Sequence, residues 1–115
     1  MQETSVIHST FVIERSYPVT PERACLRFNE GTPLQGQLCT NDIGYLDIVP
    51  DRRIVFASAM VIGEKCISAS LATVEFLPSE DGTDVIFTHQ GAFFEGSDGP
   101  QMRETGWRKL LSRLI

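Results

Sequence analysis

The chain has 115 residues, of which 42% are hydrophobic and 22% are charged, a composition typical of one globular domain with one core. Ten basic and fifteen acidic side chains give a net charge of −5, so neither nucleic acid nor an anionic membrane is an expected partner. The sequence begins with no basic and apolar leader, and it contains no long apolar run. We therefore expect a single domain over residues 1–115, soluble and cytoplasmic, without membrane insertion.

The cysteines and the missing catalytic motifs argue against metal and cofactor chemistry. Cys25, Cys39 and Cys66 are odd in number and widely spaced, without a C-x-x-C pair. This pattern is typical of neither a disulfide framework nor a structural zinc site. No P-loop, dinucleotide-binding fingerprint or nucleophile elbow is present. We expect reduced thiols that pack as small hydrophobic groups, no metal and no cofactor.

The first third of the chain predicts a strand followed by a short helix. Residues Val6–Tyr17 are rich in β-branched and aromatic types, and Pro18 then removes a backbone donor. Thr20 can cap a helix that has Pro21 at its first position. The helical pattern is lost within residues 29–33.

From Gly44 onward the sequence predicts a series of strands joined by short turns. They cover Tyr45–Val49, Ile54–Ile62, Cys66–Leu77 and Val85–Phe94. Connections this short favour an antiparallel meander. Alternation places Phe56, Ser58 and Met60 on one face, as it does Phe87 and His89, and leaves a mixed second face that we expect to be half exposed.

The last segment, Gln101–Ile115, predicts a helix that lies against the sheet, with Pro100 in front of it. Its apolar stripe runs through Met102, Gly106, Leu110 and Leu114, with Trp107 and Leu111 alongside. Glycine inside a helix costs about 1 kcal/mol relative to alanine. We therefore expect Gly106 to allow close approach to a strand or a ligand.

Four segments carry a resemblance to a known family: Phe11–Arg23, Gly44–Phe56, Gly82–Gly91 and Arg103–Leu114. In their order and spacing the sequence resembles the SRPBCC (START-like) superfamily. The branch that it resembles is that of the heat-shock-protein-90 ATPase activator homologues, related to polyketide cyclases. The resemblance implies the α+β helix-grip fold, in which a curved antiparallel sheet wraps a long C-terminal helix and leaves a cavity between them.

One departure from the family pattern lies between Phe28 and Gly44. Relatives usually have a longer segment there, with a second helix, a tryptophan and a glycine-rich strand. Either this chain is a shortened variant or residues have been omitted from it, and we favour omission because a deletion would open one wall of the grip. Omission predicts a Cα separation above about 3.8 Å between consecutive residues, most of all at Phe28–Asn29.

The implied cavity gives a set of ligand-binding candidates that combines apolar side chains with a few hydroxyl groups and one imidazole. The set is Phe56, Ser58, Met60, Ser68, Ser70, Phe87, His89, Phe93, Gly106, Trp107 and Leu110. We expect these residues to bind a hydrophobic or amphipathic small molecule, although the aromatic members can equally be core. One alternative is a cyclase or hydrolase that uses His89 as its base. Another is a co-chaperone-like protein interaction, and a homodimer is left open.

Overall fold

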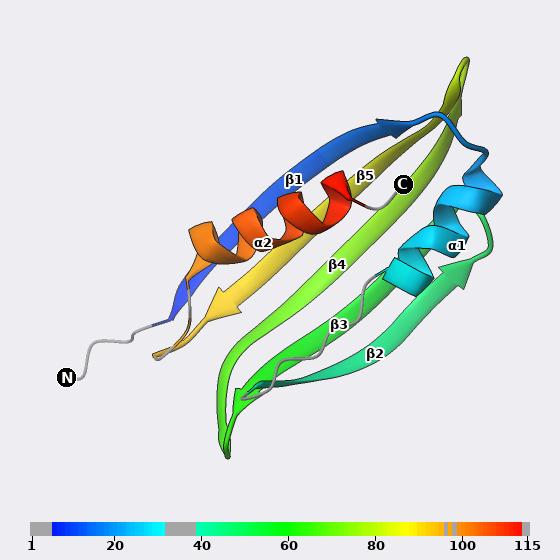
Figure 1. The fold of residues 1–115 in the computed structure, drawn as a ribbon. Helices are drawn as coiled ribbons and strands as arrows, with labels where there is room; N and C mark the ends of the chain where they lie inside the picture. Colours follow the sequence, from blue (N-terminus) through cyan, green and yellow to red (C-terminus); the bar gives the residue numbers. More distant parts are fainter. Residues whose placement is uncertain (1–5, 32–38, 96, 98, 114–115) are drawn as a thin grey trace.

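A computed structural model describes residues 6–31, 39–95, 97 and 99–113 as one five-stranded antiparallel sheet with both helices on one face (Figure 1). The elements in chain order are β1 (Ile7–Tyr17), α1 (Pro21–Gly31), β2 (Cys39–Val49), β3 (Arg53–Ile62), β4 (Lys65–Ser79), β5 (Gly82–Phe93) and α2 (Pro100–Ser112). The strand order is β1-β5-β4-β3-β2. The predicted α+β class and the meander from β2 to β5 are confirmed. Within the described ranges, no helix has the length and hydropathy needed to cross a bilayer.

The boundaries of these elements follow from local backbone chemistry. The Oγ1 atom of Thr20 accepts a hydrogen bond from the Arg23 amide at 3.3 Å, which caps α1 as predicted. Gly63 takes a φ of 62° in the two-residue turn between β3 and β4. Glycine adopts this conformation without a steric clash because it has no Cβ atom. Asp51 has a φ of 65° in the turn between β2 and β3, where a short polar side chain tolerates it.

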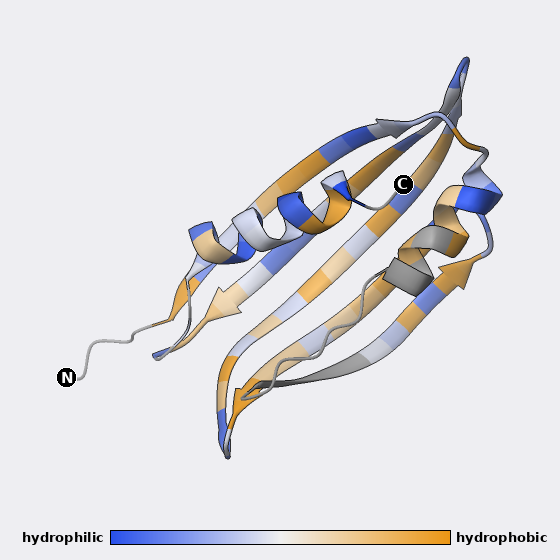
Figure 2. Ribbon diagram, in the orientation of Figure 1, coloured by the Kyte–Doolittle hydropathy of each residue, from blue (hydrophilic) through white to orange (hydrophobic). Residues whose placement is uncertain are grey.

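Strand register divides the sheet into an inner face, toward the helices, and an outer face. His89 on β5 lies opposite Phe11 on β1 and Ala72 on β4, and Ala72 lies opposite Phe56 on β3. One row of inner-face side chains therefore crosses four strands. Hydrophobic and hydrophilic residues alternate along the strands (Figure 2), as the predicted period of two requires. The outer face is partly exposed, and Val12 keeps 46% of its surface accessible.

The core lies where both helices meet the inner face of the sheet. Its centre is the aromatic cluster, which we define as Phe28 of α1, Phe56 of β3, Phe87 of β5 and Trp107 of α2. Phe28 and Trp107 stack with an interplanar angle of 7° and ring centroids 6.4 Å apart. Trp107 and Phe87 are closer, at 4.4 Å. Burial of these rings holds α1 and α2 on the same face.

The predicted orientation of the last helix is wrong by one residue. In α2 the buried residues are Trp107 and Leu111, whereas Met102 is 66% exposed. Gly106 is also exposed, and a Cβ atom built on it would meet nothing within 4 Å. The two large side chains, spaced four apart, turn the helix toward the sheet and leave the glycine on the solvent side. Leu114 lies outside the described residues.

The predicted chain break at Phe28–Asn29 falls within a helix. Both residues belong to α1, which runs from Pro21 to Gly31, further than its local pattern predicted. Contacts of Phe28 with the rings of Phe56 and Phe76 explain why the helix extends past a weak local signal. Residues 32–38 lie outside the described part of the chain, so the choice between a shortened variant and omitted residues stays a prediction.

Candidate functional site

The structure brings the ligand-binding candidates onto the inner face or against it, with the exception of Gly106. They form two groups. Phe56, Phe87, Trp107 and Leu110 belong to the aromatic core or pack against it. Ser58, Met60, Ser68, Ser70, His89 and Phe93 lie toward the end of the sheet where β5 finishes and α2 begins.

The first group fills the space between the sheet and the middle of α2. Phe56 and Phe87 are 3% and 0% exposed, and both rings contact Trp107. Around the middle of α2 these side chains pack against one another, and a ligand cavity that they line stays a prediction. Because their packing already accounts for their burial, these residues are core first, and any contact with a ligand is a proposal.

Polar side chains interrupt the apolar inner face beside this core. The hydroxyl groups of Ser58 on β3 and Ser70 on β4 lie 2.9 Å apart and are half-buried. Ser68, two residues earlier on β4, is 1% exposed and accepts a hydrogen bond from Arg103 of α2 at 3.0 Å. We call Ser58, Ser68, Ser70 and Arg103 the polar patch. Each of these serines has a hydrogen-bond partner, as buried hydroxyl groups require.

Arg103 is the residue of this site that the sequence did not single out. Its Nη2 atom also lies 3.5 Å from the sulfur of Met60, and its guanidinium carbon lies 5.1 Å from the centroid of the Phe93 ring. A cation over an aromatic face contributes about 0.5–2 kcal/mol. The signal was present in the sequence, because Arg103 precedes Trp107 by four residues and therefore lies on the same side of the helix.

His89, a member of the second group, is embedded among aromatic rings. It is 1% exposed and stacks on Phe11 with ring centroids 4.7 Å apart and an interplanar angle of 7°. The rings of Phe87 and Phe93 lie 6.3 Å away on either side of it. This environment matches a wall residue better than a general base, which needs access to its substrate.

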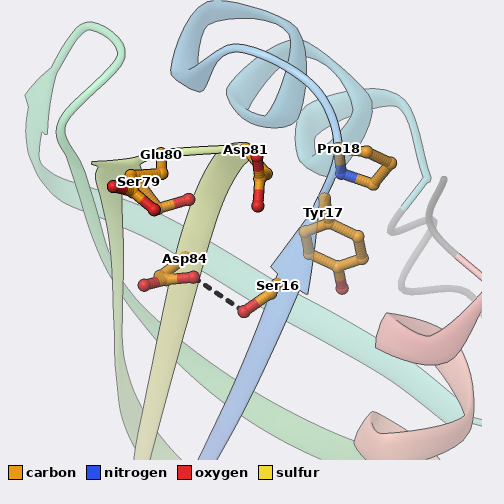
Figure 3. A pocket seen from close by; sticks show the side chains of 7 residues that line it. All are labelled: Ser16, Tyr17, Pro18, Ser79, Glu80, Asp81 and Asp84. Carbon is orange, nitrogen blue, oxygen red and sulfur yellow. Dashed lines mark hydrogen bonds between the residues drawn. The ribbon is translucent and has the colours of Figure 1, made fainter.

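A separate pocket lies at the opposite end of the sheet, between the end of β1 and the β4–β5 hairpin (Figure 3). Glu80, Asp81 and Asp84 contribute carboxylates to it, and Ser16 donates a hydrogen bond to Asp84 at 2.7 Å. It contains none of the predicted site residues. Among the described residues, no group of three or more His, Cys, Asp or Glu side chains is arranged to hold a metal ion.

Solved structures share this architecture. The chain is similar to a protein from Rhizobium loti with 39% identity over 94% of this chain and 95% of the other, at a TM-score of 0.83. A protein from Rhizobium leguminosarum is 28% identical over 98% of this chain and 95% of its own, at a TM-score of 0.84. An activator-homologue-like protein from Rhizobium etli shares the fold at 15% identity, with a TM-score of 0.61 over 99% of this chain and 84% of the other.

The family comparison agrees with the structural one. A comparison with curated proteins gave no match. The family model described as activator of Hsp90 ATPase homolog 1-like protein matches residues 24–115, which include every residue of the polar patch and the aromatic cluster. The match agrees with the observed sheet and the two helices on its inner face. The chain therefore belongs to the activator of Hsp90 ATPase homolog 1-like family and has its helix-grip fold.

Proposed function

We propose that the protein binds a small hydrophobic or amphipathic molecule on the inner face of its sheet, beside the polar patch. One observation carries this proposal: hydroxyl groups and a guanidinium lie on a face that is otherwise apolar, next to a tightly packed aromatic core. A face that served stability alone would gain more from apolar side chains at these positions. Ligand sites commonly combine an apolar lining with a few polar groups that orient the bound molecule.

The contacts of the patch support binding rather than catalysis. Ser58 and Ser70 hydrogen-bond to each other, and the hydroxyl group that accepts this bond keeps its own proton to donate to a ligand atom. Their half-buried positions leave them accessible from solvent. His89, in contrast, is enclosed by rings. The driving force would be burial of apolar ligand surface, about 25 cal/mol per Å² before the costs of ordering.

A dye titration with two matched variants tests the proposal. The probe is N-phenyl-1-naphthylamine, a neutral apolar dye, and the fluorescence of the single tryptophan, Trp107, in the core next to the patch reports its binding. We expect saturable binding that Ser70→Leu weakens at least tenfold, because leucine fills the space over the patch. Ala69→Leu adds similar bulk to the same strand on the exposed outer face and should leave binding unchanged.

Native mass spectrometry of protein purified from its own host provides the second test. An additional small-molecule mass that Ser70→Leu removes would support binding at this face. The proposal would be contradicted if Ser70→Leu left the affinity for the dye unchanged and mass spectrometry showed no additional mass. A turnover lost in His89→Gln would point to an enzyme, and a chaperone that co-purifies in stoichiometric amount would point to a co-chaperone.

A further inference from the structure

Strand β1 forms one edge of the sheet and lacks the features that usually protect an edge. The strand order pairs β1 with β5 on one side, and no strand of the described residues lies on its other side (Figure 1). An edge strand exposes a row of backbone N–H and C=O groups, and proteins usually block their pairing with lysine, proline or a bulge. The strand has neither lysine nor proline within Ile7–Tyr17, and its eleven residues pair with β5 without a shift in register.

The opposite edge of the sheet is protected. There β2 pairs with β3, and the register shifts between Tyr45 and Asp47. A bulge of this kind bends the strand and interrupts the even spacing of its backbone groups. Of the two edges, β1 is therefore the one that a further strand can extend along its full length.

The sequence of β1 is complementary to itself in an antiparallel pair. A twofold axis at Val12 pairs all eleven residues with those of a second copy, and it keeps inner face beside inner face because the side-chain period is two. Val12, an exposed apolar residue of the outer face, then lies opposite Val12 of the second copy. On the inner face, Phe11 lies opposite Ile13, and the exposed Ile7 lies opposite Tyr17. Apolar side chains therefore meet apolar side chains on both faces.

The charges of β1 fit the same arrangement. One carboxylate, Glu14, and one guanidinium, Arg15, give the strand a formal charge of zero, whereas the whole chain carries −5. In the antiparallel pair, Glu14 lies opposite Thr10 and diagonal to His8, and Arg15 lies opposite Ser9. No two like charges face each other, so two copies of this edge approach without the repulsion that their net charges cause elsewhere.

We infer that the protein forms a symmetric dimer in which β1 pairs antiparallel with β1 of a second copy, with the twofold axis at Val12. The two sheets then become one ten-stranded sheet with the helices of both copies on the same face. The contact lies at the edge of the sheet and uses no residue of the polar patch. The inference is therefore independent of the proposed function.

The state of association in solution is the first test. Sedimentation equilibrium should give twice the 12.8 kDa mass of one chain. Val12→Lys places two positive charges directly opposite each other at the axis, so it should weaken the dimer at least tenfold. Gln90→Lys is the matched control, because it adds the same charge to an exposed position of β5, the neighbouring strand inside the sheet. It should leave the dimer unchanged.

Cysteine cross-linking tests the register of the paired strands. Residues opposite each other in an antiparallel pair have Cα atoms about 4.5–5.5 Å apart, within the range that a disulfide spans. Only a residue on the axis lies opposite itself, so Val12→Cys should form at least tenfold more covalent dimer than Thr10→Cys. The double variant Thr10→Cys/Glu14→Cys should recover the cross-link. The wild type, which has three cysteines of its own, gives the background.

Three results would overturn the inference. One is a protein that stays monomeric at its highest soluble concentration. The second is a dimer that Gln90→Lys weakens as much as Val12→Lys, because the interface would then cover the outer face of the sheet. The third is a cross-link that is strongest in Thr10→Cys, which would move the axis away from Val12. A wild-type circular dichroism spectrum of each variant separates loss of the dimer from loss of the fold.

Discussion

Gly91 lies on β5 between His89 and Phe93, and its lack of a side chain leaves room for both rings. A Cβ atom built on it would lie 2.9 Å from Cε1 of Phe93 and 3.0 Å from Cε1 of His89. Both rings belong to side chains that are only 1% exposed, so neither can swing into solvent. The glycine therefore permits the aromatic wall on which Arg103 rests.

Gly91→Ala is expected to lower the free energy of unfolding by about 1–3 kcal/mol, the usual cost of overpacking a dense interior. Urea denaturation measures this loss. Gly44→Ala is a suitable control within another strand, because a Cβ atom there would meet nothing within 4 Å. Equal stability of Gly91→Ala and the wild type would show that the two rings are not held where the structure places them.

Gly106 leads to the opposite expectation. Its position is exposed and open, so only helix propensity distinguishes glycine from alanine there. Gly106→Ala should raise the free energy of unfolding by about 0.5–1 kcal/mol, with a higher melting temperature. Dye binding should not change. A lower melting temperature would indicate a close contact that the structure does not show.

At the scale of elements, one hydrogen bond joins the first strand to the last helix. The Tyr17 hydroxyl group donates to the carbonyl oxygen of Leu111, at the C-terminal end of α2. The pKa of Tyr17 is raised above its usual value mainly by burial, while nearby Arg15 acts in the opposite direction. The neutral phenol is therefore the form that stabilises the fold. Its contribution is complete below about pH 10 and is lost as the pH rises through the higher pKa of the folded state.

Tyr17→Phe should remove this hydrogen bond and lower the free energy of unfolding by about 1 kcal/mol at neutral pH. Above pH 10 the wild type should lose its advantage over the variant, because it must then bury a phenolate or release the contact. Urea denaturation at pH 7 and at pH 11 measures both effects. Tyr45→Phe is the control, since Tyr45 is 58% exposed. A stability difference between Tyr17→Phe and the wild type that does not depend on pH would contradict this account.

The last helix shows how an element can be predicted correctly while its face is not. Pro100 and the apolar spacing indicated α2, and the structure confirms it at Pro100–Ser112. The apolar face of a helix can be more than about 100° wide. The sequence is therefore compatible with a buried face centred on residue 106 and with one centred on residue 107. The partner surface selects between them. Trp107 packs against Phe28, Phe56 and Phe87. These contacts fix the rotation of α2, so that Gly106 faces solvent and Arg103 faces the sheet.

At the scale of the whole molecule, the strands and turns followed from local chemistry. Pro18 ended the first strand, Thr20 and Pro21 began the first helix, and Gly63 made the turn between β3 and β4. Alternation along the strands placed Ser58 on the same face as Phe56 and Met60, and His89 on the same face as Phe87, before any fold was considered. These features depend on residues close together in the chain, which is why sequence patterns predict them.

Tertiary structure alone decided the contacts that make the candidate site. Ser68 and Arg103 are 35 residues apart, and Tyr17 and Leu111 are 94 residues apart. Strand β1 pairs with β5 at one edge of the sheet, although four elements separate them in the chain. Composition and spacing determined which side chains were available for a site and on which face of each strand they lie. Only the packing of α2 onto the sheet brought the Arg103 guanidinium to Ser68. Contacts between residues so far apart in the chain do not follow from the local spacing of residue types, so the sequence pattern could not predict them.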